Sequence, residues 1–168
     1  KGKALAGVQV SDGRNFTVTD AKGNFAMDSE IPLGYLFVVT PNGYEPVTYL
    51  QSRPKFWESA KPGEKVDFRL KKIDNERPLG IIAIADPQIS NRCGDVDRLK
   101  NMYLPEVNRA IDSLRNKGTE PIVMTLGDVV CDYFVARGYG YTLDKFNEDF
   151  KVNAPLYHTM GNHDNDPF

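Results

Sequence analysis

Residues 157–164 read Tyr-His-Thr-Met-Gly-Asn-His-Asp, the pattern of a buried strand that runs into a glycine turn. The turn carries an amide, an imidazole and a carboxylate side by side, on Asn162, His163 and Asp164. Polar groups of these three kinds at the end of an apolar strand are typical of a chemical site. We therefore expect the fold to be organised around this turn.

Two earlier apolar runs end in the same way. Residues 80–85 lead to Asp86 and Gln88, and residues 122–127 lead to Asp128. Helical patterns separate the three runs, so the order is β, α, β, α, β, which favours parallel strands. The C-terminal ends of parallel strands share one edge of a sheet, where open α/β sheets bind ligands. We expect the three sets of polar side chains to meet there.

The first helical pattern covers residues 95–117, where apolar residues recur every three or four positions. Pro105 predicts a kink or two short helices with the proline in a first turn, and Gly118 predicts the end. A second helix is predicted over residues 143–152, capped by Thr142. The continuously apolar first strand predicts that both faces of the sheet are covered.

The first 74 residues have a different pattern, in which short alternating segments are separated by turns rich in Gly, Asn and Asp. Strands are predicted over residues 8–10, 16–19, 24–27, 35–40, 44–50 and 66–70. Many short strands with close turns predict a small β-sandwich. The polar run 71–78, which ends at a proline, predicts a boundary between domains 1–74 and 79–168.

Composition excludes some classes of protein. The chain has 168 residues, a formal net charge of −2 and no apolar run long enough to cross a membrane. This balance gives no general attraction to nucleic acid or to an anionic membrane surface. Cys93 and Cys131 each follow a strand that carries site residues, and whether they form a disulfide stays open. The abrupt start at Lys1 and the end at Phe168 suggest a piece of a longer gene product.

The polar side chains at the strand ends suit a divalent metal. Asp86, Asp128, Gln88 and Asn162 offer carboxylate and amide oxygens, which hard and borderline cations accept. The sequence has no Ser or Cys nucleophile with His and Asp at suggestive positions, and no glycine-rich phosphate loop. Ordinary turn chemistry is the alternative for Asp and Asn after strands. His158, inside the last strand, is expected to be a hydrogen-bonded core residue rather than a ligand.

Together, Asp86-x-Gln88, Gly127-Asp128 and the 161–164 turn resemble the motifs of the calcineurin-like metallophosphoesterase superfamily. The likeness covers residues 79–166 and implies the first half of a metallophosphoesterase α/β/β/α sandwich, so the whole chain would be a multidomain α and β protein. Gln88 stands where most members have His, a variant that resembles the manganese-dependent ADP-ribose and CDP-alcohol diphosphatase branch. Most members also have a second Asp three residues after the bridging one, whereas here Asp132 is four residues on.

The resemblance implies two divalent metal ions, Mn, Fe or Zn with Mn favoured. Asp86 and Gln88 would hold the first metal, Asp128 would bridge both and Asn162 would hold the second. His163 would face the phosphate as a catalytic residue, and Asp164 would orient it. The superfamily adds histidines from later strands, and this chain has only two. Residues 1–168 alone are therefore expected to be inactive or nearly so.

The front of the chain resembles the carboxypeptidase regulatory-like, transthyretin-like β-sandwich. Residues 5–13, 19–25 and 40–44 carry the likeness, which covers most of residues 4–70. Modules of this kind are usually non-catalytic and lie on proteins outside the cytoplasm. The resemblance thus implies an extracytoplasmic location, whether periplasmic, secreted or lipid-anchored.

Three functions remain open. The first is a metal-dependent phosphohydrolase that cleaves phosphodiester or diphosphate bonds of a phosphorylated small molecule or lipid headgroup. The second is a non-catalytic extracytoplasmic binding protein with a degenerate phosphoesterase domain. The third is a phosphomonoesterase on the same scaffold. No nucleic-acid partner is expected, and the oligomeric state stays open.

Overall fold

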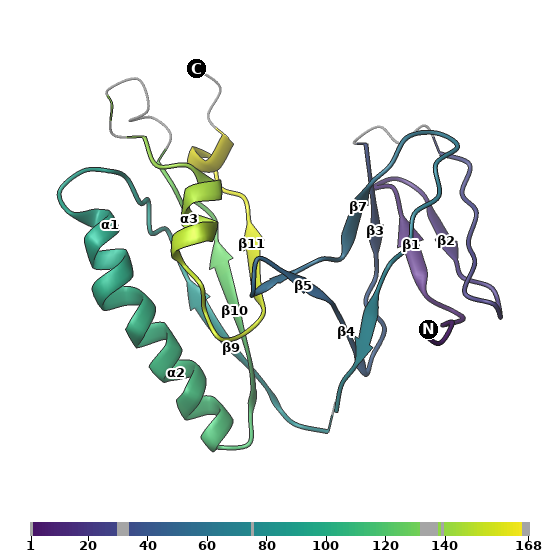
Figure 1. Ribbon diagram of the computed structural model, residues 1–168, viewed down its shortest axis with the longest axis horizontal. Coiled ribbons are helices and arrows are strands. Elements are labelled where there is room, and N and C mark those ends of the chain that lie inside the picture. The colour runs from purple at the N-terminus through teal and green to yellow at the C-terminus, as the bar shows by residue number, and fades with distance from the viewer. Residues whose placement is uncertain (1, 30–33, 75, 132–137, 139, 166–168) are drawn as a thin grey trace. The chain divides into compact units, whose positions relative to one another are not determined.

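The computed structural model describes residues 2–29, 34–74, 76–131, 138 and 140–165. The chain forms two compact units (Figure 1), the first of Lys1–Val47 and Pro54–Asn75 and the second of Thr48–Arg53 and Glu76–Phe168. The second unit thus takes in a short segment that interrupts the sequence of the first. The boundary drawn from the sequence, between residues 74 and 79, stays a prediction.

The first unit is built of short antiparallel strands. They are β1 (Gln9–Ser11), β2 (Phe16–Val18), β3 (Tyr35–Val38), β4 (Tyr44–Pro46), β7 (Trp57–Ser59) and β8 (Leu70–Lys72). A four-stranded sheet has the order β2-β1-β3-β7, and β4 pairs with β8. Val10, Leu36 and Ala60 form a small buried core against which Phe25 and Phe68 pack. These are several small sheets, and their arrangement as a sandwich stays a prediction.

Two aspartate turns lie where the sequence predicts turns. The Asp12 carboxylate, fully buried, accepts the backbone N–H groups of Arg14 at 2.8 Å and Asn15 at 2.6 Å. The Asp20 carboxylate accepts those of Lys22 and Asn24 at 2.8 and 2.9 Å. Each side chain satisfies amides that the turn takes out of the β ladder, which is why Asp is favoured there.

Two of the strands expected in this unit do not form. Residues 24–27 and 66–69 are described but lie outside any strand. Their alternation still describes which side chains turn inward, because Phe25, Met27, Val66 and Phe68 all pack on the core. Period-two burial requires only one apolar face, whereas a strand also requires a hydrogen-bonded neighbour.

The second unit contains a three-stranded parallel sheet. Its strands are β9 (Leu79–Ile84), β10 (Glu120–Leu126) and β11 (Leu156–Thr159), in the order β11-β10-β9. Thr125 pairs with Ile84 on one side and with His158 on the other, so the three strands end at nearly the same level. Two further short strands, β5 (Thr48–Tyr49) and β6 (Arg53–Pro54), pair with each other. The predicted parallel order of the three main strands is confirmed.

The first predicted helix is a continuous helical run of three parts: α1 (Asp95–Arg98), the π-helical η1 (Leu99–Tyr103) and α2 (Leu104–Asn116). Pro105 lies in the first turn of α2, as predicted. The backbone N–H of Leu104 bonds to the Leu99 carbonyl, five residues back. The π segment therefore absorbs the proline, which has no N–H to give to the preceding turn. Gly118, at φ 76°, follows the end.

The second predicted helix is shorter than expected. Helix α3 (Leu143–Asp149) begins at its Thr142 cap, whose hydroxyl accepts the Lys145 N–H at 3.2 Å. It ends before Phe150, yet Phe146 and Phe150 still stack at a centroid distance of 4.9 Å in the core. The aromatic pair packs across the helix end, so the apolar pattern outlasts the helix itself.

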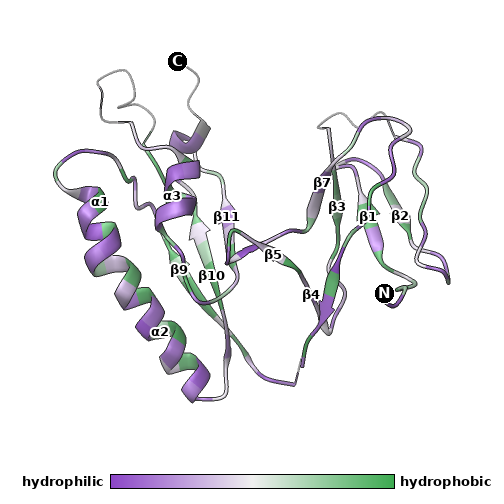
Figure 2. Ribbon diagram, in the orientation of Figure 1, coloured by the Kyte–Doolittle hydropathy of each residue, from purple (hydrophilic) through white to green (hydrophobic). Residues whose placement is uncertain are grey.

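One face of the parallel sheet is covered and the other is open among the described residues. Ile84 is 3% exposed, whereas Ile81 on the opposite face is 58% exposed. The buried side packs against α2, where Val107 and Ile111 point to the core, and Figure 2 shows apolar and polar residues sharing this helix. The expectation that both faces would be covered is therefore wrong for these residues. A continuous apolar run indicates that both faces of a strand are suited to burial, but it does not indicate which element, if any, packs on each face.

No helix in the part of the chain that the structure describes is both long and apolar enough to span a bilayer. Cys93 is exposed, Cys131 is buried, and both are thiols in the structure.

Candidate metal centre

The polar ends of the three parallel strands meet at one edge of the second unit. The Gln88 N–H bonds to the Asp128 carbonyl at 2.8 Å, and Ile89 forms a parallel bridge with Val130. The segments beyond β9 and β10 therefore stay paired past the strand ends. Asp86 and Gln88 are exposed and Asp128 is half-buried, so all three side chains reach the surface.

The backbone is unusual at these three positions. Asp86, Gln88 and Asp128 have φ values of 51°, 45° and 48°, in the left-handed region. For a residue other than glycine this conformation costs roughly 1–2 kcal/mol, and clusters of such residues are typical of functional sites. Three of the four predicted metal ligands thus make up half of the six non-glycine residues with positive φ among the described ones.

Asp86 and Gln88 contact each other directly. The Gln88 Nε2 group donates to Asp86 Oδ1 at 2.7 Å. The spacing of one residue and the left-handed backbone at both ends bring the two side chains together. A carboxylate and an amide in contact form a polar pair that a cation with oxygen ligands would fit after rotation of the amide.

The turn after β11 packs tightly on the turn after β10. A Cβ atom on Gly161 would clash with the carboxylate and the backbone nitrogen of Asp128, and one on Gly127 would lie 3.0 Å from the Gly161 Cα. Both positions therefore require glycine for close approach. Asp128 Oδ1 also accepts the backbone N–H of His163 at 2.9 Å. Asn162 is exposed and lies in the chain between Gly161 and His163, the two residues that make these contacts.

Asp164 joins the same two turns. Its Oδ1 accepts the N–H groups of Val129 and Val130 at 2.7 and 3.0 Å, and its Oδ2 accepts that of Gly161 at 2.9 Å. These contacts give Asp164 a positioning role that the sequence did not predict, because three backbone amides are held by one carboxylate. Its predicted orientation of the His163 imidazole stays a prediction.

His158 lies beneath this edge, in a polar network. Its Nδ1 lies 2.8 Å from the Thr125 hydroxyl and its Nε2 lies 3.0 Å from Asn147 Oδ1. Burial, together with the nearby Arg53 charge, lowers the pKa of His158 to about 4, although the Asp164 carboxylate opposes the shift. The prediction of a hydrogen-bonded core histidine is confirmed. Arg53 and Asn147 carry no signal in the sequence, since each belongs to a polar stretch without a motif.

The described side chains fit part of a divalent-metal site. They offer two carboxylates, on Asp86 and Asp128, and two amides, on Gln88 and Asn162, all exposed or half-buried at one edge. No group of three or more His, Cys, Asp and Glu side chains suited to a metal occurs among the described residues. The individual ligand assignments stay predictions. Asp132 falls in 132–137, outside the described residues.

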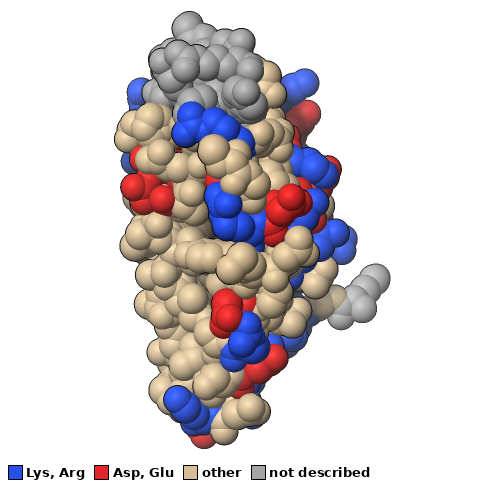
Figure 3. Space-filling model, turned by 90° about the vertical axis from the view of Figure 1, so that its left-hand side faces the viewer, with Lys and Arg blue, Asp and Glu red and all other residues tan. Residues whose placement is uncertain are grey.

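Charges of both signs mix on the second unit. Lys100 pairs with Asp149 at 2.9 Å and Lys145 with Glu148 at 3.1 Å. The face seen in Figure 3 likewise shows basic and acidic side chains interspersed. A mixed surface of this kind does not build an extended field of a single sign.

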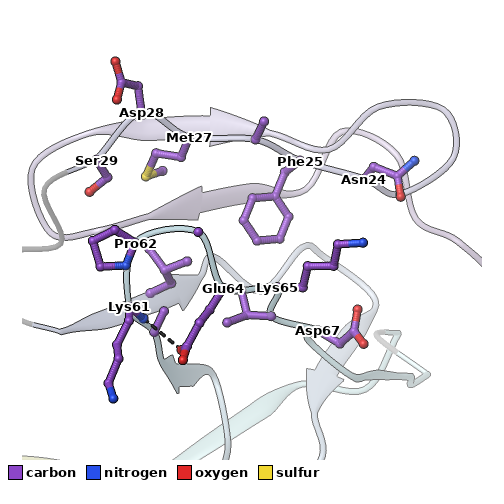
Figure 4. A pocket seen from close by; sticks show the side chains of 16 residues that line it. Asn24, Phe25, Met27, Asp28, Ser29, Lys61, Pro62, Glu64, Lys65 and Asp67 are labelled. Atoms are coloured by element: carbon purple, nitrogen blue, oxygen red, sulfur yellow. Dashed lines mark hydrogen bonds between the residues drawn. The ribbon is translucent and has the colours of Figure 1, made fainter.

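The first unit has a groove of its own, with a volume of about 590 Å³. Figure 4 shows Phe25 and Met27 on one side of it, facing the loop of Lys61 and Glu64, where the Lys61 N–H bonds to the Glu64 carboxylate at 3.0 Å. None of the predicted site residues lines this groove.

Comparison with known families bears on the first unit. Residues 1–73 match the family model described as the N-terminal part of calcineurin-like phosphoesterases. The match supports the calcineurin-like phosphoesterase family. That family implies a hydrolase, one that is generally dependent on two metal ions. No curated protein and no solved structure matches the chain.

The matched segment contains none of the phosphoesterase motifs. Support for the calcineurin-like family thus comes from residues 1–73, independently of Asp86, Asp128 and the 161–164 turn. The same segment carries the resemblance to a carboxypeptidase regulatory-like sandwich, which the match does not test.

Proposed function

We propose that the chain forms part of a metal-dependent phosphohydrolase that cleaves phosphodiester or diphosphate bonds at a dinuclear site. The observation that supports this function best is the meeting of Asp86, Gln88 and Asp128, each with left-handed backbone, at one sheet edge beside the turn of Asn162. Mn is the favoured metal, with Fe or Zn as the other choices. The substrate is a phosphorylated small molecule or lipid headgroup, and the protein acts outside the cytoplasm.

Four side chains would hold the metals. Asp86 and Gln88 would serve one ion, Asp128 both and Asn162 the other, since their oxygens suit divalent cations. The bound metals would supply Lewis acidity that activates water and neutralises charge on the phosphate. The backbone N–H of His163 holds one oxygen of Asp128 and leaves the other available at the edge.

His163 and Asp164 would do the remaining work. The His163 imidazole would face the phosphate and give a proton to the leaving oxygen. Asp164 holds the backbone of both turns through its three amide contacts, which fixes the position of the residues between them. Fixed placement of such groups is a large part of the catalysis of phosphoryl transfer.

The test is hydrolysis of bis-p-nitrophenyl phosphate with Mn²⁺, run on residues 1–168, on the full gene product and on that product with Asp128→Asn. The substitution removes the charge but keeps an oxygen that accepts the His163 N–H, so the turn is retained. Asp112→Asn, on the exposed side of α2, is the matched control. We expect turnover by the full product and by the control, loss with Asp128→Asn, and little turnover by residues 1–168.

Silence of the full product, with no metal found by elemental analysis, would contradict the proposal and favour a binding protein. Faster turnover of p-nitrophenyl phosphate than of the diester would instead identify a phosphomonoesterase.

A further inference from the structure

The second unit has a buried polar network that the metal site does not use. Arg53 is 3% exposed, and its Nε donates to Asn147 Oδ1 at 2.7 Å. The other guanidinium contacts are with the Ser52 hydroxyl at 3.0 Å and the Phe150 carbonyl at 3.5 Å. These three acceptors are neutral, and burial lowers the pKa of Arg53 to about 10. A buried cation is tolerated only when it is held in well-made hydrogen bonds.

The geometry fixes which atoms carry protons. Arg53 Nε can only donate, so the Asn147 atom beside it must be the oxygen. His158 Nε2 lies 3.0 Å from that oxygen and must donate to it as well. In the neutral imidazole, Nδ1 is then an acceptor for the Thr125 hydroxyl. One amide oxygen thus connects the Arg53 segment to strand β11.

A second contact joins the same segment to the same strand. The Leu156 N–H, on the edge of β11 that faces away from β10, donates to the Ser52 carbonyl at 2.8 Å. On its other side β11 is tied to β10 through the ladder and through the Thr159 hydroxyl, which donates to the Thr125 carbonyl at 2.8 Å. Strand β11 is therefore held from both edges just before it enters the site.

The strand leads directly into the turn that packs on Asp128. Only Met160 separates Thr159, the last residue of β11, from Gly161, and the Gly161 position leaves no room for displacement toward Asp128. A shift of β11 along its axis would therefore move Gly161 and the His163 N–H away from the carboxylate.

We propose that Ser52, Arg53 and Asn147 form a positioning network for β11, which sets the register of the 161–164 turn against Asp128. Its importance for catalysis rests on the function proposed above, whereas the positioning itself can be measured without turnover. None of the three residues touches the predicted ligands, so they act through His158 and the strand.

The primary test compares amide hydrogen exchange by NMR in the wild-type chain and in Asn147→Ala. Alanine favours the helix more than asparagine, so α3 itself is not weakened. We expect the Gly161 and His163 amides to exchange about tenfold faster, after normalisation to amides of α2, because loss of the shared acceptor frees β11. Ile111→Val, a core change in α2, is the control for general destabilisation and should speed all these amides by one common factor.

A conservative variant adds a signature that a merely structural role would not produce. Asn147→Asp retains the acceptor for both donors, so we expect it to preserve protection of the Gly161 amide. The new carboxylate would also raise the pKa of His158, which ¹⁵N shifts of the imidazole report together with its Nε2–H tautomer. Loss of protection in Asn147→Asp equal to that in Asn147→Ala would overturn the inference.

Binding of Mn²⁺, followed by electron paramagnetic resonance, separates the two proposals. A full gene product that does not bind Mn²⁺, with selective loss of turn protection in Asn147→Ala, would overturn the metal function and support the positioning network. The opposite result would be equal affinity of wild type and Asn147→Ala for Mn²⁺, together with exchange of the Gly161 and His163 amides that changes only as much as that of the α2 amides. That result would overturn the network and leave the metal function standing.

Discussion

Replacing Gly161 by alanine is a sharp test of the packing between the two turns. The backbone of Gly161 lies outside the left-handed region, so alanine is not disfavoured there by conformation. The whole effect should arise from its Cβ, which would overlap the carboxylate and backbone nitrogen of Asp128. Overpacking of this kind costs about 1–3 kcal/mol. Displacement that also breaks the His163 N–H bond to Asp128 adds about 1.5 kcal/mol, because the acceptor is charged.

We therefore expect Gly161→Ala to lower the free energy of unfolding of the second unit by about 2.5–4.5 kcal/mol. Gly118→Ala is the control, since Gly118 has a φ of 76° but open space around its Cβ position. It should cost about 1 kcal/mol from backbone strain and leave the site intact.

The assay is urea unfolding followed by far-UV circular dichroism. Helices α1, α2 and α3 all lie in the second unit, so this signal reports it. Fluorescence of Trp57, the single tryptophan, reports the first unit and should be unchanged in both variants. Equal losses of stability and equal Mn²⁺ affinities for Gly161→Ala and Gly118→Ala would refute the close approach of the two turns.

Two further predictions concern polar groups of the second unit. The pKa of His158 is lowered from 6.5 to about 4, so the folded state favours the neutral imidazole. The stabilisation that this gives is fully present above pH 6.5 and is lost as the pH falls toward 4. The free energy of unfolding should decrease by about 3 kcal/mol over that range. Urea midpoints across this range should show the loss in wild type and a flatter profile in His158→Gln, and equal profiles would contradict the neutral buried imidazole. Asp164→Asn replaces one acceptor oxygen by an amide that faces backbone N–H groups, and we expect a loss of about 2–4 kcal/mol in thermal unfolding. Asp112→Asn should change stability by less than about 0.5 kcal/mol, and a similarly small effect at Asp164 would argue against its three amide contacts.

The meeting of the polar strand ends at one edge of the sheet could be predicted from sequence because its signal is local, whereas the roles of the residues there stay predictions. Each predicted ligand follows an apolar strand by a few residues, and parallel order then places the strand ends together. The left-handed backbone at Gln88 could not be predicted, since glutamine has no preference for it. Two of the three amide contacts of Asp164 also could not be predicted, because they reach Val129 and Val130, 35 and 34 positions away in sequence.

The fold was predicted less completely where hydrogen-bonded pairing with another strand decides whether a segment forms a strand. Alternation correctly indicated that Phe25 and Phe68 turn inward, but it could not indicate that their segments lack a ladder partner. Pro105 predicted a disturbed helix, and the π segment shows how the disturbance is absorbed. The docking of Thr48–Arg53 on β11 could not be predicted, because a short segment carries no sequence pattern that indicates which distant strand it will contact.

The interruption of one unit's sequence by a segment of the other has a consequence for synthesis on the ribosome. Arg53 lies 94 positions before its partner Asn147 in the sequence, and the neighbouring Ser52 carbonyl accepts its hydrogen bond from Leu156, which is synthesised later still. The early part of the chain will emerge and begin to fold while its loop at 48–53 has no place to dock. Closure of so long a loop is slow in folding, so docking of β11 on residues 48–53 should come after the first unit has begun to fold. A protein begun at residue 79 would lack that loop and expose the outer edge of β11, an edge on which chains can aggregate.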